Sequence, residues 1–161
     1  MLLIDVDGVL TDGRIIYTDE GVELKAFHVR DGTGIKIWLQ QGKLAALVTG
    51  RRSRAVDLRA AELGITMVVQ GVADKFAAYQ RLLADSNVQN NSVCAIGDDL
   101  PDLPVLNHCG CAVAVADACP EVKATAHYVT RARGGHAAVR EVIELILQAQ
   151  NRWPGSIKMK N

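Results

Sequence analysis

Two aspartates near the start of the chain have the types and spacing to hold a cation. Asp5 and Asp7 directly follow an apolar run at residues 1–4 and precede Gly8. The run predicts a buried parallel strand, and open α/β sheets keep their ligand sites at the carboxyl ends of strands. Two carboxylates are costly to remove from water without a positive partner, so a divalent cation fits. A solvated turn is the alternative for this motif alone.

Three further groups of polar residues stand at equivalent positions. The strand ends of a parallel sheet share one edge, so these groups can meet the first two aspartates. Together they offer a hydroxyl, an ammonium and more carboxylates, which suits phosphoryl transfer because its transition state requires positioning and charge neutralisation. The groups are Thr49-Gly50-Arg51 after a predicted strand at 44–48, Lys75 at the start of a predicted helix, and Asp98, Asp99 and Asp102 after a predicted strand at 93–96.

Predicted strands and helices alternate between these groups, which favours a parallel sheet covered by helices on both faces. We therefore expect an α/β fold, a Rossmann-like three-layer sandwich with a central parallel sheet, a β-hairpin flap over the site and no cap domain. Residues 1–150 are expected to form a single domain, followed by a tail at 151–161. The remaining predicted elements are the hairpin at 14–29, strands at 67–69 and 111–115, and helices at 34–41, 55–63, 74–84, 103–107 and 136–150.

Composition excludes several classes of protein. The 161 residues include 18 basic and 18 acidic side chains, so the chain has no net charge and no general basic field for nucleic acid. No apolar run reaches the roughly 18 residues that span a membrane, and no signal peptide precedes the first motif, so a cytoplasmic protein is expected. The cysteines lack the paired spacing of a zinc site and are expected to be buried thiols; they are Cys94, Cys109, Cys111 and Cys119.

The ordered set of motifs resembles that of the haloacid dehalogenase superfamily of phosphatases. The motifs are Asp5-x-Asp7-Gly8-Val9-x-Thr11-Asp12-Gly13, Thr49-Gly50-Arg51, Lys75 and Gly97-Asp98-Asp99-x-x-Asp102. The resemblance covers nearly the whole chain, and a match of four motifs in order is far more specific than any one of them.

The resemblance implies a role for each motif. Asp5 would attack phosphorus to give an aspartyl phosphate, and Asp7 would protonate the leaving alkoxide and then activate water. Thr49 and Lys75 would hold the phosphoryl oxygens. Mg²⁺ would be bound by Asp5, the backbone carbonyl of Asp7, and Asp98. The other expected contacts are Gly8, Gly50, Arg51 and Arg30 with the substrate, and Asp99 and Asp102 with the residues that bind the metal.

Some of these residues have a structural alternative. Arg51 could clamp a substrate carboxylate through two parallel hydrogen bonds, or it could merely begin a helix. Arg30 and Asp31 could form an ion pair behind the flap. Asp102 is expected to orient Lys75 or the ligands of the metal.

Spacing narrows the resemblance further. The gaps between motifs leave no room for a cap domain, and within the capless members the chain is similar to the family of 3-deoxy-D-manno-octulosonate 8-phosphate phosphatases. The segments that carry this similarity include residues 25–35, 114–118 and 128–131. It implies hydrolysis of a sugar-acid phosphate for lipopolysaccharide precursors, in a homotetramer whose flap and tail complete a neighbour's site. His28 and His136 depart from the family pattern, and the chain starts without the lead-in that many members carry.

Two other interpretations stay open. The substrate could be a sialic-acid-type 9-phosphate or a range of small phosphomonoesters. Alternatively, the chain could be a non-catalytic assembly domain, although its intact motifs argue against that.

Overall fold

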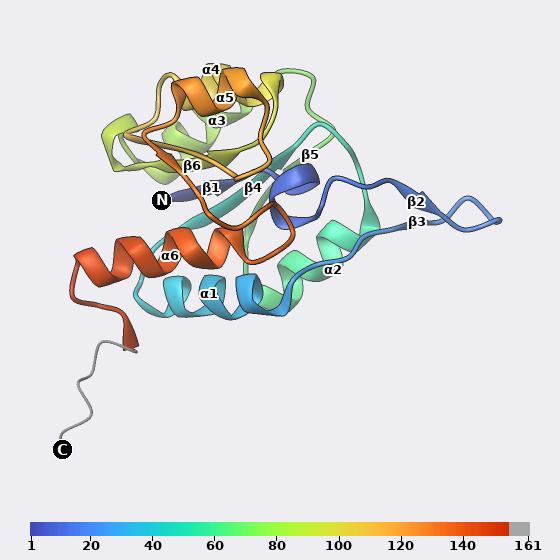
Figure 1. Cartoon of the computed structure of the whole chain (residues 1–161), viewed down its shortest axis with the longest axis horizontal. Coiled ribbons are helices and arrows are strands. Elements are labelled where there is room, and N and C mark those ends of the chain that lie inside the picture. The colour runs from blue at the N-terminus through green and yellow to red at the C-terminus, as the bar shows by residue number, and fades with distance from the viewer. Residues whose placement is uncertain (155–161) are drawn as a thin grey trace.

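The computed structural model describes residues 1–154, which form an α/β sandwich around a six-stranded parallel sheet (Figure 1). The strand order is β5-β4-β1-β6-β7-β8, so β1 lies in the middle between β4 and β6. This confirms the predicted fold class. The strands are β1 (Leu2–Ile4), β4 (Ala45–Thr49), β5 (Met67–Gln70), β6 (Cys94–Gly97), β7 (Cys111–Ala114) and β8 (Tyr128–Val129).

Helices cover both faces of the sheet. In Figure 1, α1, α2 and α6 lie below the sheet and α3, α4 and α5 lie above it. Strands β1, β4, β6 and β7 are short apolar runs that are almost entirely buried, as expected where helices pack on each side of a parallel sheet, whereas the edge strands β5 and β8 are partly exposed. The helices are α1 (Val29–Gln40), α2 (Arg54–Leu63), α3 (Lys75–Ser86), α4 (Leu103–Leu106), α5 (Pro120–Thr125) and α6 (Ala138–Ala149).

The predicted hairpin is present but shorter than 14–29. Strand β2 (Ile16–Tyr17) pairs antiparallel with β3 (Glu23–Leu24), and the hairpin projects from the body of the molecule (Figure 1). Five large apolar side chains on it are each 45% to 58% exposed, which two strands of this length cannot bury on their own. They are Ile15, Ile16, Tyr17, Val22 and Leu24.

The start of α1 was predicted too late, at residue 34 instead of Val29. The predicted hairpin had included Val29, and Gly32 and Gly34 interrupt the helical pattern of the residues that follow. The ring of His28 caps the helix by accepting a hydrogen bond from the Arg30 N–H (3.2 Å). A Cβ at Gly32 would meet the guanidinium of Arg59, so glycine lets this side chain of α2 lie against α1 without moving. The glycine therefore serves helix packing, a reason that lies outside the local sequence.

Two short elements, α5 and β8, were not predicted, because they are too brief to show a hydrophobic period. None of the helices within residues 1–154 is long and apolar enough to cross a membrane. The described cysteines are all free, with Cys94 and Cys109 buried and Cys111 and Cys119 half-buried. Residues 155–161 of the predicted tail lie outside the described residues, so its expected part in a neighbour's site and the domain boundary at residue 150 stay predictions.

Candidate active site

The predicted site residues meet in one cleft at the carboxyl edge of the sheet. Asp5 follows β1, Thr49 ends β4 and Asp98 follows β6, so three adjacent strands deliver their polar residues to the same place. The cleft has a volume of about 390 Å³. The predicted residues that line it are Asp5, Asp7, Thr49, Gly50, Arg51, Lys75, Asp98, Asp99 and Asp102.

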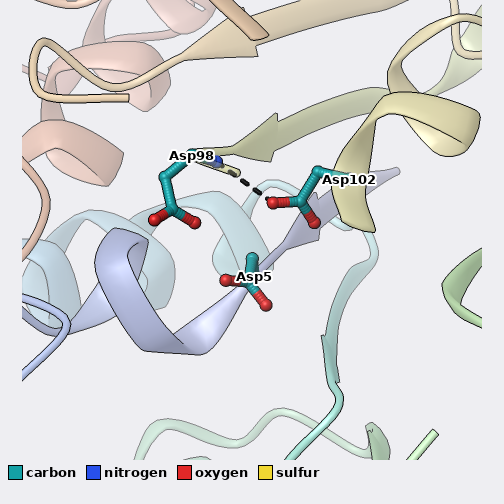
Figure 2. A group of neighbouring side chains, drawn as sticks. All are labelled: Asp5, Asp98 and Asp102. Atoms are coloured by element: carbon teal, nitrogen blue, oxygen red, sulfur yellow. Dashed lines mark hydrogen bonds between the residues drawn. The ribbon is translucent and has the colours of Figure 1, made fainter. Parts of the chain in front are cut away.

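Three carboxylates cluster at the bottom of this cleft (Figure 2). Asp5, Asp98 and Asp102 each offer an oxygen, and these oxygens lie within 4.8 Å of one another. Burial raises the pKa of Asp5 well above its ordinary value, and the charge of Asp102 adds to the shift. Burial, with help from Asp102, also raises the pKa of Asp98 to about 7. A group of three carboxylates with hard oxygen donors fits a divalent cation such as Mg²⁺, whose charge would offset the repulsion between the carboxylates.

Lys75 holds this cluster together from one side. Its ammonium donates to Oδ1 of Asp5 and to Oδ1 of Asp102, at 2.7 Å each. Burial alone would lower the pKa of Lys75, but the two carboxylates outweigh it and raise the pKa. The residue is the first of α3, where Asp74 caps the helix by accepting from the N–H groups of Phe76 and Ala77. The cap therefore fixes the point from which Lys75 reaches the site.

Asp102 has both oxygens occupied. Besides Lys75, it accepts hydrogen bonds from the backbone N–H groups of Asp98 (3.1 Å) and Asp99 (3.3 Å). These bonds hold the loop after β6 in a short turn, so that the Asp98 carboxylate faces Asp5 (Figure 2). Asp102 thus contacts both Lys75 and the backbone of the loop that carries Asp98.

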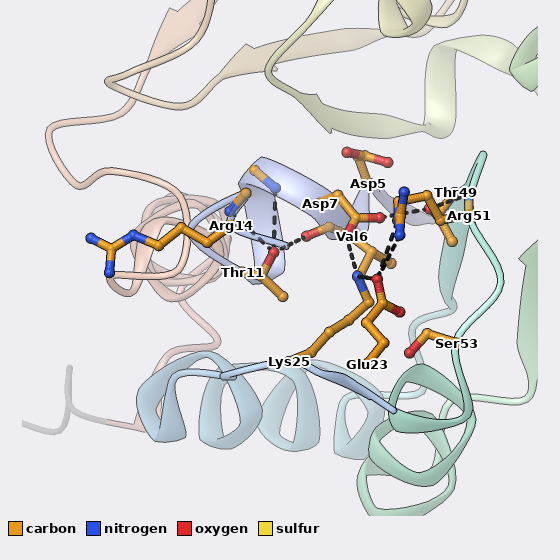
Figure 3. A network of polar contacts seen from close by, with 12 residues as sticks. Asp5, Val6, Asp7, Thr11, Arg14, Glu23, Lys25, Thr49, Arg51 and Ser53 are labelled. Atoms are coloured by element: carbon orange, nitrogen blue, oxygen red, sulfur yellow. Dashed lines mark hydrogen bonds and ion pairs between the residues drawn. The ribbon is translucent and has the colours of Figure 1, made fainter. Parts of the chain in front are cut away.

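Asp7 lies at the mouth of the cleft, where its carboxylate has two partners (Figure 3). The Thr49 hydroxyl donates to Oδ2 at 3.0 Å, and the ammonium of Lys25 donates to Oδ1. Lys25 in turn lies 3.5 Å from Oε1 of Glu23, and the same oxygen accepts two hydrogen bonds from Arg51, at 2.8 and 3.3 Å. The base of the hairpin thus contacts the site directly.

Sequence reasoning missed the hairpin side chains in this network. Glu23 and Lys25 are two residues apart, so they point to one side of the extended chain, and that spacing was the available signal. Tyr17 was missed as well; its hydroxyl accepts a hydrogen bond from Arg51 at 3.0 Å. Arg51 reaches the cleft as predicted, with hairpin groups as its partners.

A tight turn at residues 6–10 carries Asp7 past the end of β1. Gly8 has φ of +98°, and a Cβ there would clash with the carboxylate of Asp98, so only glycine allows this approach. The hydroxyl of Thr11 donates to the Val6 carbonyl (3.2 Å) and accepts from the Gly13 N–H (3.3 Å). Thr11 belongs to the first motif, and its part in closing the turn emerges only in the folded structure.

Two predicted site residues, Gly8 and Arg30, are not among the residues that line the cleft; Gly8 lies in the turn beside it, whereas Arg30 lies farther along the chain. Arg30 is exposed on the first turn of α1. The alternative ion pair with Asp31 is also not formed, since Oδ1 of Asp31 accepts from the backbone N–H of Arg140 instead. That interpretation was wrong because Asp31 points into the protein while Arg30 points to solvent.

Comparison with known proteins places this geometry in a family. The haloacid dehalogenase-like hydrolase family matches residues 64–143. The 3-deoxy-D-manno-octulosonate 8-phosphate phosphatase of Yersinia pestis is 50% identical over 156 residues, which is 97% of this chain and 83% of that protein. The chain belongs to the haloacid dehalogenase-like hydrolases and, within them, to the octulosonate 8-phosphate phosphatase family.

Solved structures of this family agree with the fold. A structure of the octulosonate 8-phosphate phosphatase from Moraxella catarrhalis, in complex with magnesium, phosphate and the KDO molecule, aligns with a TM-score of 0.94 at 45% identity, covering 97% of this chain and 90% of that one. A cobalt-bound family member from Haemophilus influenzae aligns with a TM-score of 0.90 at 41% identity, over 93% and 88% of the two chains. As in a capless family, only the hairpin and α1 separate β1 from β4, and only α2 and β5 separate β4 from α3.

Proposed function

We propose that this chain is a Mg²⁺-dependent phosphatase that hydrolyses 3-deoxy-D-manno-octulosonate 8-phosphate to the free sugar acid and phosphate, as a step toward lipopolysaccharide precursors. The observation that carries the proposal is the meeting of Asp5 and Asp98, at the ends of the adjacent strands β1 and β6, with Lys75 from the start of α3. The full-length similarity to phosphatases of that name supports the choice of substrate.

The proposed reaction proceeds in two displacements at phosphorus. In the first, a carboxylate oxygen of Asp5 forms a bond to phosphorus while the bond to the sugar oxygen breaks, and Asp7 gives that oxygen a proton. In the second, Asp7 takes a proton from water, whose oxygen attacks phosphorus and releases phosphate from Asp5. Thr49 and Lys75 hold the phosphoryl oxygens, since both point into the cleft.

We assign the metal to Asp5, Asp98 and the backbone carbonyl of Asp7. When bound, Mg²⁺ would supply positive charge that offsets the repulsion between the substrate phosphate and the acidic cluster. Asp99 and Asp102 support these ligands from the loop after β6, where Asp102 holds the backbone of that loop.

Arg51 is the proposed partner of the substrate's carboxylate. A guanidinium can bind a carboxylate through two parallel hydrogen bonds. In the structure the Nε and a terminal nitrogen of Arg51 both donate to one oxygen of Glu23, Oε1, so Arg51 already binds a carboxylate at the cleft. The substrate would therefore compete with Glu23 for Arg51. Gly8 and Gly50 would let the substrate approach the backbone, and a substrate contact for Arg30 stays a prediction.

We also propose a homotetramer as the active unit. The cleft is open, and the hairpin beside it exposes the apolar side chains described above, so a neighbouring subunit that covered the hairpin would also shield the cleft from water. The expected cytoplasmic location likewise stays a prediction.

A phosphate-release panel tests the function. The purified chain with Mg²⁺ should release phosphate fastest from octulosonate 8-phosphate, more slowly from a sialic-acid-type 9-phosphate and from small phosphomonoesters. Asp5→Asn, assayed in parallel, reports any contaminating phosphatase. A preference for the 9-phosphate would overturn the substrate assignment, and inactivity of the folded protein toward every ester would favour the assembly-domain alternative.

A further inference from the structure

Lys25 occupies an unusual place for a lysine. It follows β3 on the hairpin, yet its side chain is only 1% exposed. A buried ammonium is costly unless anions surround it, and here the carboxylates of Asp7 and Glu23 do so (Figure 3). The fold thus buries a positive charge directly beside the proposed acid and base.

The two oxygens of Asp7 are held by groups from different elements. Thr49, at the end of β4, donates to Oδ2, and Lys25, from the hairpin, donates to Oδ1. With both oxygens bound, the carboxylate cannot rotate about its bonds to the chain without losing a partner. Thr49 belongs to a predicted motif, whereas Lys25 has no role in the reaction described so far.

We propose that Lys25 is a positioning residue that aims the carboxylate of Asp7 at the oxygen of the leaving group. Glu23 forms ion pairs with both Lys25 and Arg51. Asp7, the hairpin and Arg51, which is proposed to bind the substrate's carboxylate, therefore form one connected network. The inference rests on the proposed function, because it assigns a task to Asp7 in that reaction.

The proposal predicts a dependence on the leaving group. An alkyl oxygen departs poorly without a proton, so misplacing Asp7 should slow its departure strongly. A p-nitrophenolate anion leaves without being protonated. The rate at which p-nitrophenol is released in the first turnover should therefore not depend on Lys25. A residue with a merely structural role would affect both substrates alike.

The test compares Lys25→Met and Lys25→Arg with wild type, and uses Lys36→Met as a matched control, since Lys36 is an exposed lysine on α1. Single-turnover measurements give the rate of phosphoryl transfer from octulosonate 8-phosphate and from p-nitrophenyl phosphate. For Lys25→Met we expect a fall of about 10- to 100-fold with the sugar phosphate, a KM within about threefold of wild type, and an unchanged p-nitrophenol burst. Lys25→Arg should restore most of the loss, because its guanidinium can donate to the same oxygen.

Equal losses for both substrates, or no loss with the sugar phosphate, would overturn the proposal. Circular dichroism and inhibition by orthovanadate check that the fold and the phosphate-binding groups persist; Lys25→Gln, which is too short to reach Asp7, takes the place of the Met variant if the latter does not fold. If wild type rejects octulosonate 8-phosphate but cleaves another alkyl phosphate, the proposed substrate fails and Lys25 is judged with that ester. If wild type cleaves no alkyl phosphate, both proposals fail.

Discussion

At the scale of single residues, the site depends on buried carboxyl groups. Burial raises the pKa of Asp5 and Asp98 and so favours their neutral forms, unless positive charge lies beside them. Lys75 offsets part of the charge of Asp5, but three carboxylates share one small space. Asp5 is proposed to attack phosphorus through a carboxylate oxygen, which an asparagine lacks. Asp5→Asn should therefore lower turnover by about 1,000-fold or more. Phosphate release measures the loss, and circular dichroism should show an unchanged fold. Asp85→Asn, which changes an exposed aspartate on α3, serves as the matched control and should be fully active.

The acidic cluster also predicts the response to metal removal. Its ligands are hard oxygens, so Mg²⁺ should sustain activity better than Zn²⁺ does. Chelation should stop phosphate release, and added Mg²⁺ should restore it, while the melting temperature shows that the apo chain remains folded. Activity that survives exhaustive chelation would contradict the metal assignment.

A third residue-scale prediction concerns Asp31, which is 1% exposed. Its Oδ1 accepts from the Arg140 N–H at 2.7 Å, whereas Oδ2 has no hydrogen-bond partner among residues 1–154. Burial raises the pKa of this carboxyl above its ordinary value, although the Arg140 bond opposes the shift. A raised pKa contributes stability that is fully present below the unfolded pKa and is lost as pH rises through the folded pKa.

We therefore expect wild type to lose stability relative to Asp31→Asn as pH rises from about 4, the ordinary pKa of an aspartate, toward neutrality. Urea unfolding of both proteins at several pH values measures the difference. Parallel stability curves would show that Asp31 does not titrate differently in the folded state.

At the scale of elements, the strand ends could be predicted because each apolar run meets its polar motif without a spacer, as Ile4 meets Asp5. The contacts of the hairpin with Asp7 and Arg51 could not be predicted, since they depend on how the hairpin lies against distant parts of the chain. The α1 boundary failed for a similar reason. Taken locally, Gly32 predicts a break in the helix, whereas in the fold it lies within α1 at the point where the Arg59 side chain contacts that helix.

Another glycine contact links two loops at the site and can be tested. Gly134 packs on the carbonyl of Gly8, and its N–H donates to Asp117 at 2.9 Å. A methyl group in Gly134→Ala would push the turn that carries Asp7. We expect a loss of about 1–3 kcal/mol of stability and a higher Mg²⁺ requirement, measured by urea unfolding and by metal titration of activity.

Gly42→Ala is the control for that variant. Gly42 has φ of +72°, but the space around its Cβ position is open, so the change costs backbone strain without a clash. It should lower stability and leave the Mg²⁺ requirement unchanged. An equal metal effect in both variants would contradict a specific contact between the two loops.

At the scale of the whole molecule, helices cover both faces of the sheet, whereas the hairpin of β2 and β3 projects away from them (Figure 1). Ile16 and Leu24 are directly paired across its two strands, and both are about half exposed. Burying such a pair in an interface is favourable by roughly 25 cal/mol for each Å² of apolar surface removed from water. The hairpin is therefore the part of the described chain best suited to bind another subunit.

This argument gives the last prediction. Light scattering at assay concentration should report a mass near four chains for wild type, as the proposed homotetramer requires. Replacing Ile16 and Leu24 together with aspartate should yield a smaller species, because charged side chains would have to be buried without partners. Its activity should fall as well, since no neighbouring subunit would then shield the cleft from water or hold the hairpin that carries Glu23 and Lys25. Leu145→Asp, at a half-exposed position on α6 away from the hairpin, should change neither mass nor activity. A monomeric double variant with full activity would contradict the proposal that the homotetramer is the active unit.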